Sequence, residues 1–228
     1  MSKRVLAIIP AFNEEDCIQS TVEELKRVEG TVDFIIINDG SSDSTLDICL
    51  NRGFPVVNLP VNSGLAVGFR TGMKYAYRMG YDYAVQFDAD GQHRPEFINV
   101  MLNAMEENQS NIVVGSRFVC AKKSKSLRMI GSRIITRIIK LTTGKRISDP
   151  TSGLRMYDRS MISSFAHNPH LNPEPETLAM LLRNGAKIDE VQVSMRERQG
   201  GESYLNLTKS ISYMLRVVSS IVLAKWFR

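Results

Sequence analysis

The chain has few of the residues and segments that mark secreted or membrane-spanning proteins. Its three cysteines, Cys17, Cys49 and Cys120, are odd in number and lack the spacing of a metal site. This pattern is typical of a reduced, cytoplasmic protein. The N-terminal stretch MSKRVLAIIPAFNEE has too short an apolar run for a signal peptide, and no segment reaches the ~20 apolar residues that span a bilayer.

Two glycine-rich nucleotide-binding motifs are also missing. No G-x-G-x-x-G follows the first predicted strand, and no G-x-x-x-x-G-K-[ST] occurs anywhere in the chain. Dinucleotide-binding and P-loop sites are therefore disfavoured. There is no internal repeat, low-complexity tract or clear linker, which favours one domain with a specialised C-terminal part.

Acidic residues are absent from one long segment. Residues 121–148 contain nine Lys or Arg and no Asp or Glu, so the rest of the chain carries −4 of the total +5. Such asymmetry indicates an anionic partner: nucleic acid, a membrane surface or a phosphorylated substrate. Aromatic residues for base stacking are lacking from residues 122–146, which argues against nucleic acid.

The apolar residues that are present alternate between strand and helix patterns. Strand-like runs occur at residues 5–9, 34–37, 55–59, 83–87 and 112–114. Helical patterns lie between them at residues 14–27, 44–51, 64–79 and 95–106. This order predicts an α/β fold with a Rossmann-like, mostly parallel sheet flanked by helices. Such sheets bind ligands beyond the carboxyl ends of their strands.

Polar residues gather at three of these strand ends: PAFNEE, NDGSSDST and DADGQH. In the second, Asp39 and Gly40 turn the chain, and Ser42 or Asp43 caps the next helix. A turn does not require the acid, so Asp39 has a second interpretation, as an acceptor of hydrogen bonds from a nucleobase or ribose. Both interpretations stay open from the residues alone.

In the third strand end, Asp88 and Asp90 alternate along the chain and would point the same way if the strand geometry continued. Gly91 lets the backbone turn, and Gln92 offers another oxygen. Hard oxygen donors without a His or Cys cluster favour Mg²⁺ or Mn²⁺. The alternative is an ordinary turn with a helix cap. His93 is given no ligand role.

Six stretches, in order, resemble family 2 glycosyltransferases of the GT-A fold, and more narrowly the dolichyl- and polyprenyl-phosphate sugar synthases: VLAIIPAFNEE, FIIINDGSSDST, VQFDADGQHRPE, VVGSRF, SDPTSGLRMYDRS and VQVSMRERQGGES. The resemblance covers residues 4–203, and the pair DADGQH and DPTSGLR is fairly specific. Phe12, Gly91 and Tyr204 stand where tyrosine, leucine and lysine are usual. The membrane-spanning helices of some relatives are absent.

The resemblance implies a site for a nucleotide-sugar donor and a divalent cation. Its nucleotide pocket would comprise Pro10, Phe12, Glu14, Ile37 and Asp39, and Asp88 and Ala89 would line the donor. Asp90 and Gln92 would bind Mg²⁺ or Mn²⁺ on the diphosphate. Cleavage of the sugar–phosphate bond leaves a nucleoside diphosphate, whose developing charge the metal neutralises.

The implied acceptor is polyprenyl phosphate. Its second pKa lies near ~6, so it is a largely ionised nucleophile at neutral pH and needs cations more than a strong base. Arg117, Arg133 and Arg198 match the family positions for this work, with bidentate pairing as the natural geometry. Asp149 would position or polarise the acceptor; a turn or cap before Pro150 is the alternative.

Two basic, apolar segments are expected to form helices. In residues 126–142, Ile130, Ile134, Ile138 and Leu141 recur at helical spacing beside Arg133, Arg137 and Lys140. This pattern favours a helix in an anionic membrane interface over a surface helix packed on the core. Residues 204–228 would form a second amphipathic helix that docks on the membrane, a small membrane protein or another copy of the chain. Residues 1–203 would form the catalytic domain.

These observations predict an inverting, metal-dependent hexosyltransferase, peripheral on the cytoplasmic face of the membrane. The resemblance to bacterial relatives implies UDP-glucose or UDP-N-acetylglucosamine as donor and undecaprenyl phosphate as acceptor. The product would be a lipid-linked sugar donor for cell-envelope glycan modification. One alternative is a GT-A enzyme acting on a glycan hydroxyl, with Glu174 or Glu176 as base. The other is a non-enzymatic membrane-binding module.

Overall fold

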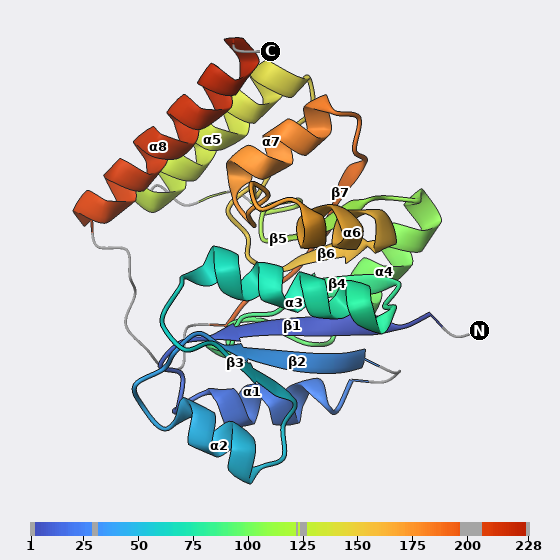
Figure 1. Cartoon of the computed structure of the whole chain (residues 1–228). Helices are drawn as coiled ribbons and strands as arrows, with labels where there is room; N and C mark the ends of the chain where they lie inside the picture. Colours follow the sequence, from blue (N-terminus) through green and yellow to red (C-terminus); the bar gives the residue numbers. More distant parts are fainter. Residues whose placement is uncertain (1–2, 29–31, 122, 124–126, 197–206, 227–228) are drawn as a thin grey trace.

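A computed structural model describes residues 3–28, 32–121, 123, 127–196 and 207–226 (Figure 1). In this part of the chain, the strands are β1 (Val5–Ala11), β2 (Val32–Asn38), β3 (Val56–Asn58), β4 (Tyr83–Gln86), β5 (Ile112–Ser116), β6 (Arg155–Asp158) and β7 (Ile188–Gln192). They form one sheet in the order β3-β2-β1-β4-β6-β5-β7. β6 runs antiparallel to both neighbours, and the other pairs are parallel. The predicted mostly parallel sheet is confirmed.

The helices are α1 (Ile18–Leu25), α2 (Thr45–Asn51), α3 (Leu65–Met79), α4 (Phe97–Asn108), α5 (Leu127–Thr143), α6 (Arg159–His167), α7 (Pro175–Arg183) and α8 (Leu207–Trp226). Every predicted helix is present. The first begins at Ile18 rather than at residue 14, because Glu14 belongs to the loop that follows β1. The sequence did not predict β6, β7, α6 or α7.

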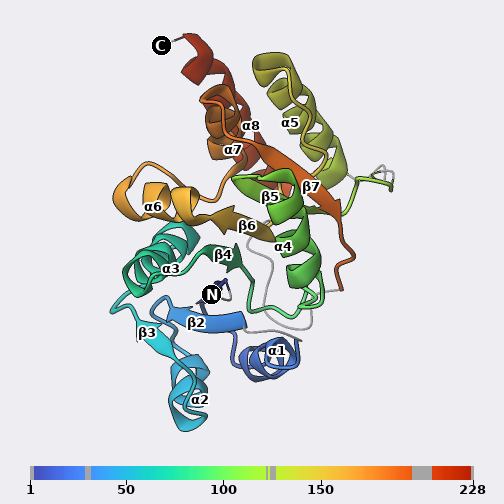
Figure 2. The same ribbon diagram turned by 90° about the vertical axis from the view of Figure 1, so that its right-hand side faces the viewer.

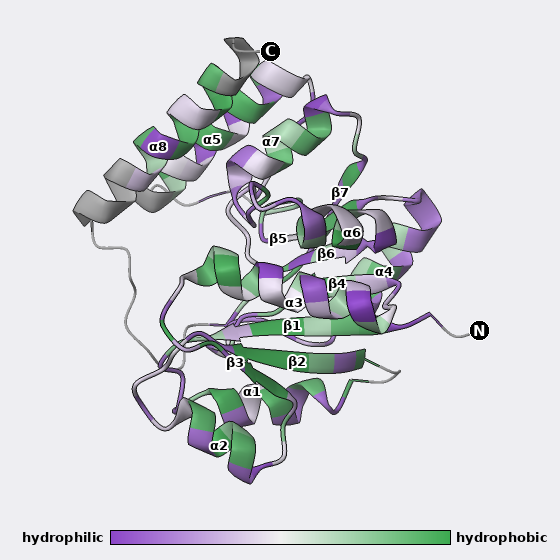
Figure 3. Cartoon of the chain, in the orientation of Figure 1, coloured by the Kyte–Doolittle hydropathy of each residue, from purple (hydrophilic) through white to green (hydrophobic). Residues whose placement is uncertain are grey.

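The sheet is covered on both faces, as the apolar strands require (Figure 2). Val5, Ala7 and Ile9 of β1 pack in a cluster with α1, α2 and α4. Leu6 and Ile8 pack on the opposite face with α3, α6 and α7. Figure 3 shows β1 and β2 as largely hydrophobic strands. Burial of each Leu or Ile contributes about 1.5–3 kcal/mol, so these strands anchor the fold.

A third cluster joins α5, α7 and α8, which lie together beside the sheet (Figure 1). Ile135 and Ile139 of α5 contact Val217 and Ile221 of α8 within it. The C-terminal helix therefore packs on the body of the protein. Its predicted docking on a membrane or a partner stays a prediction.

Candidate functional site

A cleft of about 570 Å³ opens at the carboxyl ends of β1, β2 and β4. We call it the central cleft. It is lined by Pro10, Ala11, Phe12, Glu14, Asp39, Asn62, Gly64, Leu65, Gly68, Asp88, Ala89, Asp90 and Glu174. The loops of three parallel strands meet here, and they bring together six of the seven residues predicted for the nucleotide-sugar site, with Asp90 of the predicted metal pair.

Ile37 is the predicted nucleotide-site residue that the cleft lining does not include. Its side chain is fully buried in the cluster beneath α3. Gly68 of α3 lies over it, since a Cβ built on that glycine would meet Ile37 Cγ2 at 3.9 Å. The Ile37 side chain therefore lies beneath the cleft and is not part of its lining, and its predicted role in nucleotide binding stays a prediction.

Asp39 is buried and holds the loop that leads into α3. Its Oδ1 accepts the backbone N–H of Ser63 at 2.8 Å, and its Oδ2 accepts that of Gly64 at 2.7 Å. The acid therefore has a structural purpose beyond the local turn. Each carboxylate oxygen retains a further lone pair, so Asp39 can also accept a hydrogen bond from a ligand in the cleft.

The loops after β1 and β2 are interlocked by side-chain bonds. The Ser42 N–H donates to Asn13 Oδ1 at 2.9 Å, and the Glu14 N–H donates to Thr45 Oγ1 at 2.9 Å. The N-cap of α2 is Ser44, without a side-chain cap, whereas Asp43 accepts the Thr45 N–H at 3.0 Å. Of the two predicted caps, Asp43 is therefore the one that acts at the start of this helix.

The segment carrying Asp88 and Asp90 leaves the strand earlier than expected. β4 ends at Gln86, and the chain turns through residues 89–90. Gly91 has a φ of 73°, which confirms the turn predicted there. Both aspartates line the central cleft because of this turn, not because of strand alternation.

Hydrogen bonds with nearby side chains and backbone groups fix the positions of both acids. The Asp88 N–H donates to His93 Nδ1 at 2.9 Å, and Gln86 Nε2 donates to Asp88 Oδ1 at 3.3 Å. Asp90 is 6% exposed, and its Oδ1 accepts the Gln92 N–H at 3.1 Å. His93 is buried and supports Asp88 from behind.

The donor set fits a hard divalent cation whose shell is completed by a ligand. Asp88, Asp90 and Gln92 carry side-chain oxygens of this hard type beside the turn. Within the described ranges, no group of three or more His, Cys, Asp or Glu is arranged to hold a metal. Mg²⁺ is commonly bound by one or two carboxylates together with substrate phosphates, so this arrangement is compatible with such an ion.

A second pocket, of about 220 Å³, adjoins the first, and we call it the side pocket. It is lined by Asp88, Gln92, His93, Arg117, Met129, Ser132, Ile135, Thr151, Ser152, Gly153, Met195, Tyr213 and Met214. Asp88 lines both the side pocket and the central cleft. Ligands in the two spaces would therefore meet at this carboxylate.

Arg117 and Asp149, predicted as separate acceptor residues, form a bidentate ion pair. Arg117 Nε lies 2.7 Å from Asp149 Oδ2, and an Arg117 terminal nitrogen lies 3.0 Å from Oδ1. Asp149 is fully buried, and the Arg117 side chain is 32% exposed. Glu190 of β7 accepts the backbone N–H groups of Ser148 and Asp149, which fixes the loop.

Three further cationic residues bear on acceptor binding. The sequence predicted Arg133 and Arg198 for this role, and it did not predict Lys123. Arg133 of α5 donates to the backbone carbonyl of Lys123 at 2.6 Å. The Lys123 ammonium donates to Ser132 Oγ at 2.7 Å, and Ser132 lines the side pocket. Burial, helped by the charges of Arg117 and Arg133 and opposed by those of Asp149 and Glu190, lowers the pKa of Lys123 to about 8. Arg198 lies outside the described residues.

Arg155 holds the DPTSG loop in place from within the protein. Its side chain is 2% exposed and donates to the carbonyls of Pro150 at 2.8 Å and Ser152 at 2.9 Å. A Cβ at Gly153 would lie 2.7 Å from Asp88 Oδ2, so a larger residue in this loop would displace the Asp88 carboxylate. The loop therefore packs directly against the Asp88 carboxylate.

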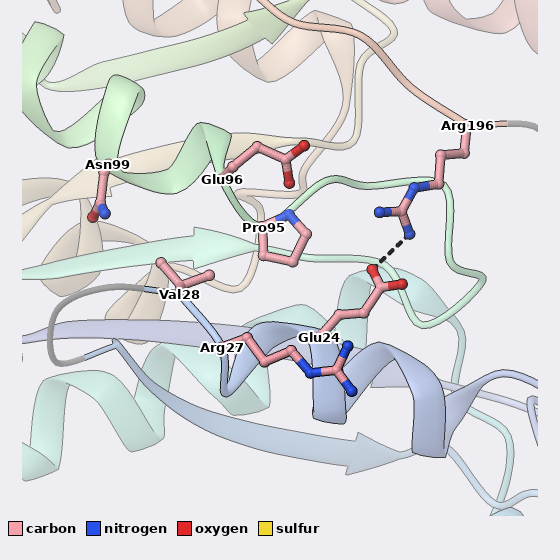
Figure 4. Close-up of a pocket in the computed structure, with 7 residues that line it drawn as sticks. All are labelled: Glu24, Arg27, Val28, Pro95, Glu96, Asn99 and Arg196. Atoms are coloured by element: carbon pink, nitrogen blue, oxygen red, sulfur yellow. Dashed lines mark hydrogen bonds and ion pairs between the residues drawn. The ribbon is translucent and has the colours of Figure 1, made fainter.

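A separate pocket between α1 and the start of α4 contains an ion pair that ties distant segments together (Figure 4). Arg196 lies 2.6 Å from Glu24 of α1. The Arg196 N–H also donates to the Gln92 carbonyl at 3.0 Å. This pair connects the chain after β7 to α1 and to the loop that bears Asp90.

The sequence matches the model of Glycosyl transferase family 2 over residues 6–165. The chain belongs to this family. This family 2 glycosyltransferase is 30% identical over 214 residues to the UDP-N-acetylglucosamine–dolichyl-phosphate N-acetylglucosaminyltransferase of Methanococcus voltae, covering 84% of this chain and 85% of that protein. It is 25% identical to the polyprenol monophosphomannose synthase of Mycolicibacterium smegmatis, covering 95% of this chain and 86% of that protein.

The fold is shared with a solved glycosyltransferase. Glucosyl-3-phosphoglycerate synthase from Mycobacterium tuberculosis, in complex with Mn²⁺, UDP and phosphoglyceric acid, has a TM-score of 0.73 and 19% identity to this glycosyltransferase. The likeness covers 98% of this chain and 78% of that one. The predicted GT-A fold and the predicted family are both confirmed.

The surface of α5 and α8 carries exposed apolar side chains. On α5, Ile130 is 42% exposed, Ile134 43% and Leu141 79%, with exposed Arg137 and Lys140 on the same helix. The buried side of α5 is instead formed by Ile135 and Ile139. Of the predicted apolar row, Ile130, Ile134 and Leu141 therefore face outward, whereas Ile138 is partly buried and packs against the third cluster. Among the described residues, no helix is long and apolar enough to cross a membrane.

Several pocket residues of this glycosyltransferase had no signal in the sequence. Ser132 and Tyr213 reach the side pocket from α5 and α8, which are distant in the chain. Glu174 was considered only as a base, and the structure places it in the central cleft. Their proximity depends on helix packing, which residue patterns do not reveal.

Proposed function

We propose that this glycosyltransferase moves a hexose from a nucleotide-sugar to polyprenyl phosphate, with inversion at the anomeric carbon. The observation that carries this proposal is the position of Asp88, which lines the central cleft and the side pocket. A donor in the first and a phosphate acceptor in the second would meet there. The names of the relatives, which specify dolichyl phosphate and polyprenol, support this acceptor class.

In the proposed reaction, an oxygen of the acceptor phosphate attacks the anomeric carbon. The bond from that carbon to the diphosphate oxygen breaks, and the nucleoside diphosphate leaves. One in-line displacement inverts the configuration. No proton has to be removed from an ionised phosphate, so the site needs no general base.

The reaction needs positive charge near the acceptor phosphate, and the cationic residues at the side pocket supply it. Arg117 uses two of its five N–H donors on Asp149, which leaves three for a phosphate. Asp149 then acts by orienting Arg117 toward the acceptor. Lys123, which donates to Ser132 Oγ, and Arg133, which donates to the Lys123 carbonyl, add positive charge, and Arg198 is proposed to contribute from the segment after β7. These charges reduce the repulsion between acceptor and donor phosphates.

Asp88, Asp90 and Gln92 are proposed to hold Mg²⁺ or Mn²⁺ with the donor diphosphate. When bound, such an ion neutralises the negative charge that develops on the leaving nucleoside diphosphate. Pro10, Phe12, Glu14 and Asp39 would bind the nucleotide at the other end of the cleft. UDP-glucose and UDP-N-acetylglucosamine are the donors to test first.

We propose that α5 lies on the cytoplasmic face of a membrane, where the lipid acceptor is found. The exposed row of Ile130, Ile134 and Leu141 would enter the interface, and Arg137 and Lys140 would contact anionic lipid. α8 carries Leu215, Val222 and Leu223 as further exposed apolar residues. These suit the same surface, a small membrane protein or a second copy of the chain.

Transfer to a glycan hydroxyl is the second candidate, because Glu174 lines the central cleft and could act as a base. The decisive experiment supplies both acceptors. The protein is incubated with radiolabelled UDP- and GDP-sugars, Mg²⁺ or Mn²⁺, and either undecaprenyl phosphate in vesicles or a soluble glycan. Labelled lipid phosphate supports the proposal, whereas label only in the glycan, or in neither product, contradicts it.

A further inference from the structure

Glu174 is the residue of the central cleft that comes from outside the first 90 residues. It is the N-cap residue of α7, and its side chain is 27% exposed. Its Oε2 accepts the hydroxyl of Tyr213 at 2.5 Å, and its Oε1 lies 4.0 Å from the guanidinium of Arg216. Both partners belong to α8. The C-terminal helix therefore fixes a carboxylate in the cleft.

The chemistry of the cleft limits what Glu174 can recognise. A carboxylate accepts hydrogen bonds only, and it is repelled by a diphosphate. Asp88 and Asp90 are proposed to hold the metal on the diphosphate, and Asp39 accepts the N–H groups of Ser63 and Gly64 at the proposed nucleotide end. The part of the donor that is neutral and rich in hydroxyl donors is the sugar.

We propose that Glu174 accepts hydrogen bonds from hydroxyl groups of the donor sugar, and that Tyr213 is a positioning residue that holds Glu174 for this contact. This inference rests on the proposed function. It makes α8 a part of the donor site, in addition to any role on the membrane. It also assigns sugar recognition to a residue remote in sequence from the nucleotide pocket.

Tyr213 is suited to this task by its surroundings. It lies in the lining of the side pocket, next to Met214, which contacts Gly131 of α5. Burial raises the pKa of Tyr213, and Glu174 raises it further, so the hydroxyl stays protonated and donates. With Oε2 engaged by Tyr213, the remaining lone pairs of Glu174 are available to the sugar.

The test compares affinities for a nucleotide with and without its sugar, measured by calorimetry in the presence of Mn²⁺. The probes are UDP, UDP-glucose, UDP-N-acetylglucosamine, GDP and GDP-mannose. The variants are Glu174→Gln, Tyr213→Phe and their combination. Tyr77→Phe is the matched control, because Tyr77 packs against His167 away from both pockets.

We expect Glu174→Gln to weaken binding of the nucleotide-sugar by about tenfold or more, as loss of a hydrogen bond to a charged group predicts, with the free nucleotide unaffected. Tyr213→Phe should weaken the same affinity by a smaller factor. It should have no further effect when Glu174 is already Gln, because it acts through that residue. Tyr77→Phe should match the wild type.

Equal losses for nucleotide and nucleotide-sugar in Glu174→Gln would overturn the inference, since they indicate a change in the shape of the whole cleft. Unchanged nucleotide-sugar affinity in that variant would overturn it as well. Additive effects of the two substitutions would reject the positioning role of Tyr213. If the wild type binds none of the probes, the proposed function itself fails, a result distinct from any difference among variants.

Discussion

At the scale of single residues, the first prediction concerns Asp90. Asp90→Asn removes one anionic oxygen from the proposed metal ligands and should lower transfer activity by at least about tenfold. Asp47→Asn, at an exposed position in the first turn of α2, is the matched control and should keep full activity. Full transfer activity of Asp90→Asn in buffer freed of metal with EDTA would contradict the metal role.

Asp39 gives the second prediction, in which stability and binding change together. Asp39→Ala leaves the N–H groups of Ser63 and Gly64 without their partner. Loss of hydrogen bonds to a charged acceptor should lower the free energy of unfolding by about 2–3 kcal/mol. Nucleotide affinity should fall as well, because the loop into α3 lines the cleft. Thermal denaturation and calorimetry measure the two effects, and an unchanged melting temperature would contradict the structural one.

Lys123 gives the third prediction, a dependence of acceptor binding on pH. With a pKa of about 8, Lys123 is charged below pH 8 and neutral above it. The acceptor phosphate stays ionised throughout, so the KM for acceptor should rise as the pH passes from 7 to 9. Lys123→Arg stays charged and should remove the rise. The same rise in that variant would assign the pH effect to another group.

Lys123 also makes the stability of the fold depend on pH, with the opposite sign to its effect on acceptor binding. The pKa of Lys123 in the folded protein lies below the ordinary value of 10.5. Between about pH 8 and 10.5 the unfolded chain therefore binds more protons than the folded one. The contribution of this group to the free energy of unfolding rises with pH across that window.

At the scale of elements, the sequence predicted the parts with strong apolar patterns. β1 and β2 are apolar on both faces, and the helices between the first strands have clear periodicity. β7 was missed because it carries Asp189 and Glu190 and no long apolar run. Its acids are matched by distant partners, since Ser110 donates to Asp189 and the Ser148 N–H donates to Glu190. Such long-range compensation has no local signature.

The candidate site, like the fold, could be predicted from the sequence only in part. The polar strand ends predicted most of the central cleft, because parallel strands deliver their loops to one edge. The pairing of Arg117 with Asp149, and the approach of Tyr213 to Glu174, depend on how α5, α7 and α8 pack. The side pocket could therefore not be predicted from the sequence and was found only in the structure.

Helix α5 gives the fourth prediction. The double variant Arg137→Gln with Lys140→Gln should weaken binding to anionic liposomes by about 2 kcal/mol, or about 30-fold, as two cations near the surface contribute. The loss should shrink at high salt. Turnover on a short, detergent-dispersed lipid phosphate should stay near that of the wild type.

The control for α5 removes the same charge elsewhere. Lys74→Gln with Arg78→Gln lies on the exposed side of α3, away from the apolar row of α5. It should bind liposomes almost as the wild type does. Equal losses in the two double variants would show that net charge, and not the α5 surface, governs membrane binding.

At the scale of the whole molecule, the two pockets differ in where their residues come from. Residues up to Asp90 supply all of the central cleft lining except Glu174. Residues from Asp88 to Met214 supply the side pocket. The sheet joins these halves through the antiparallel pairing of β4 with β6.

The formation of the two pockets by different halves of the chain has a consequence for the evolution and the engineering of such enzymes. A gene crossover in the loop between α4 and β5 would exchange one substrate preference and leave the other in place. The fifth prediction is that a chimera with residues 1–110 of this chain and the remainder of a relative keeps the nucleotide preference of this chain and takes the lipid preference of the relative. Mass spectrometry of the released nucleoside diphosphate and of the lipid product, with several donors and lipids supplied together, measures the two preferences. Diversification of such enzymes could then proceed by recombination of halves, with Glu174 as the residue through which the second half still influences which sugar is carried.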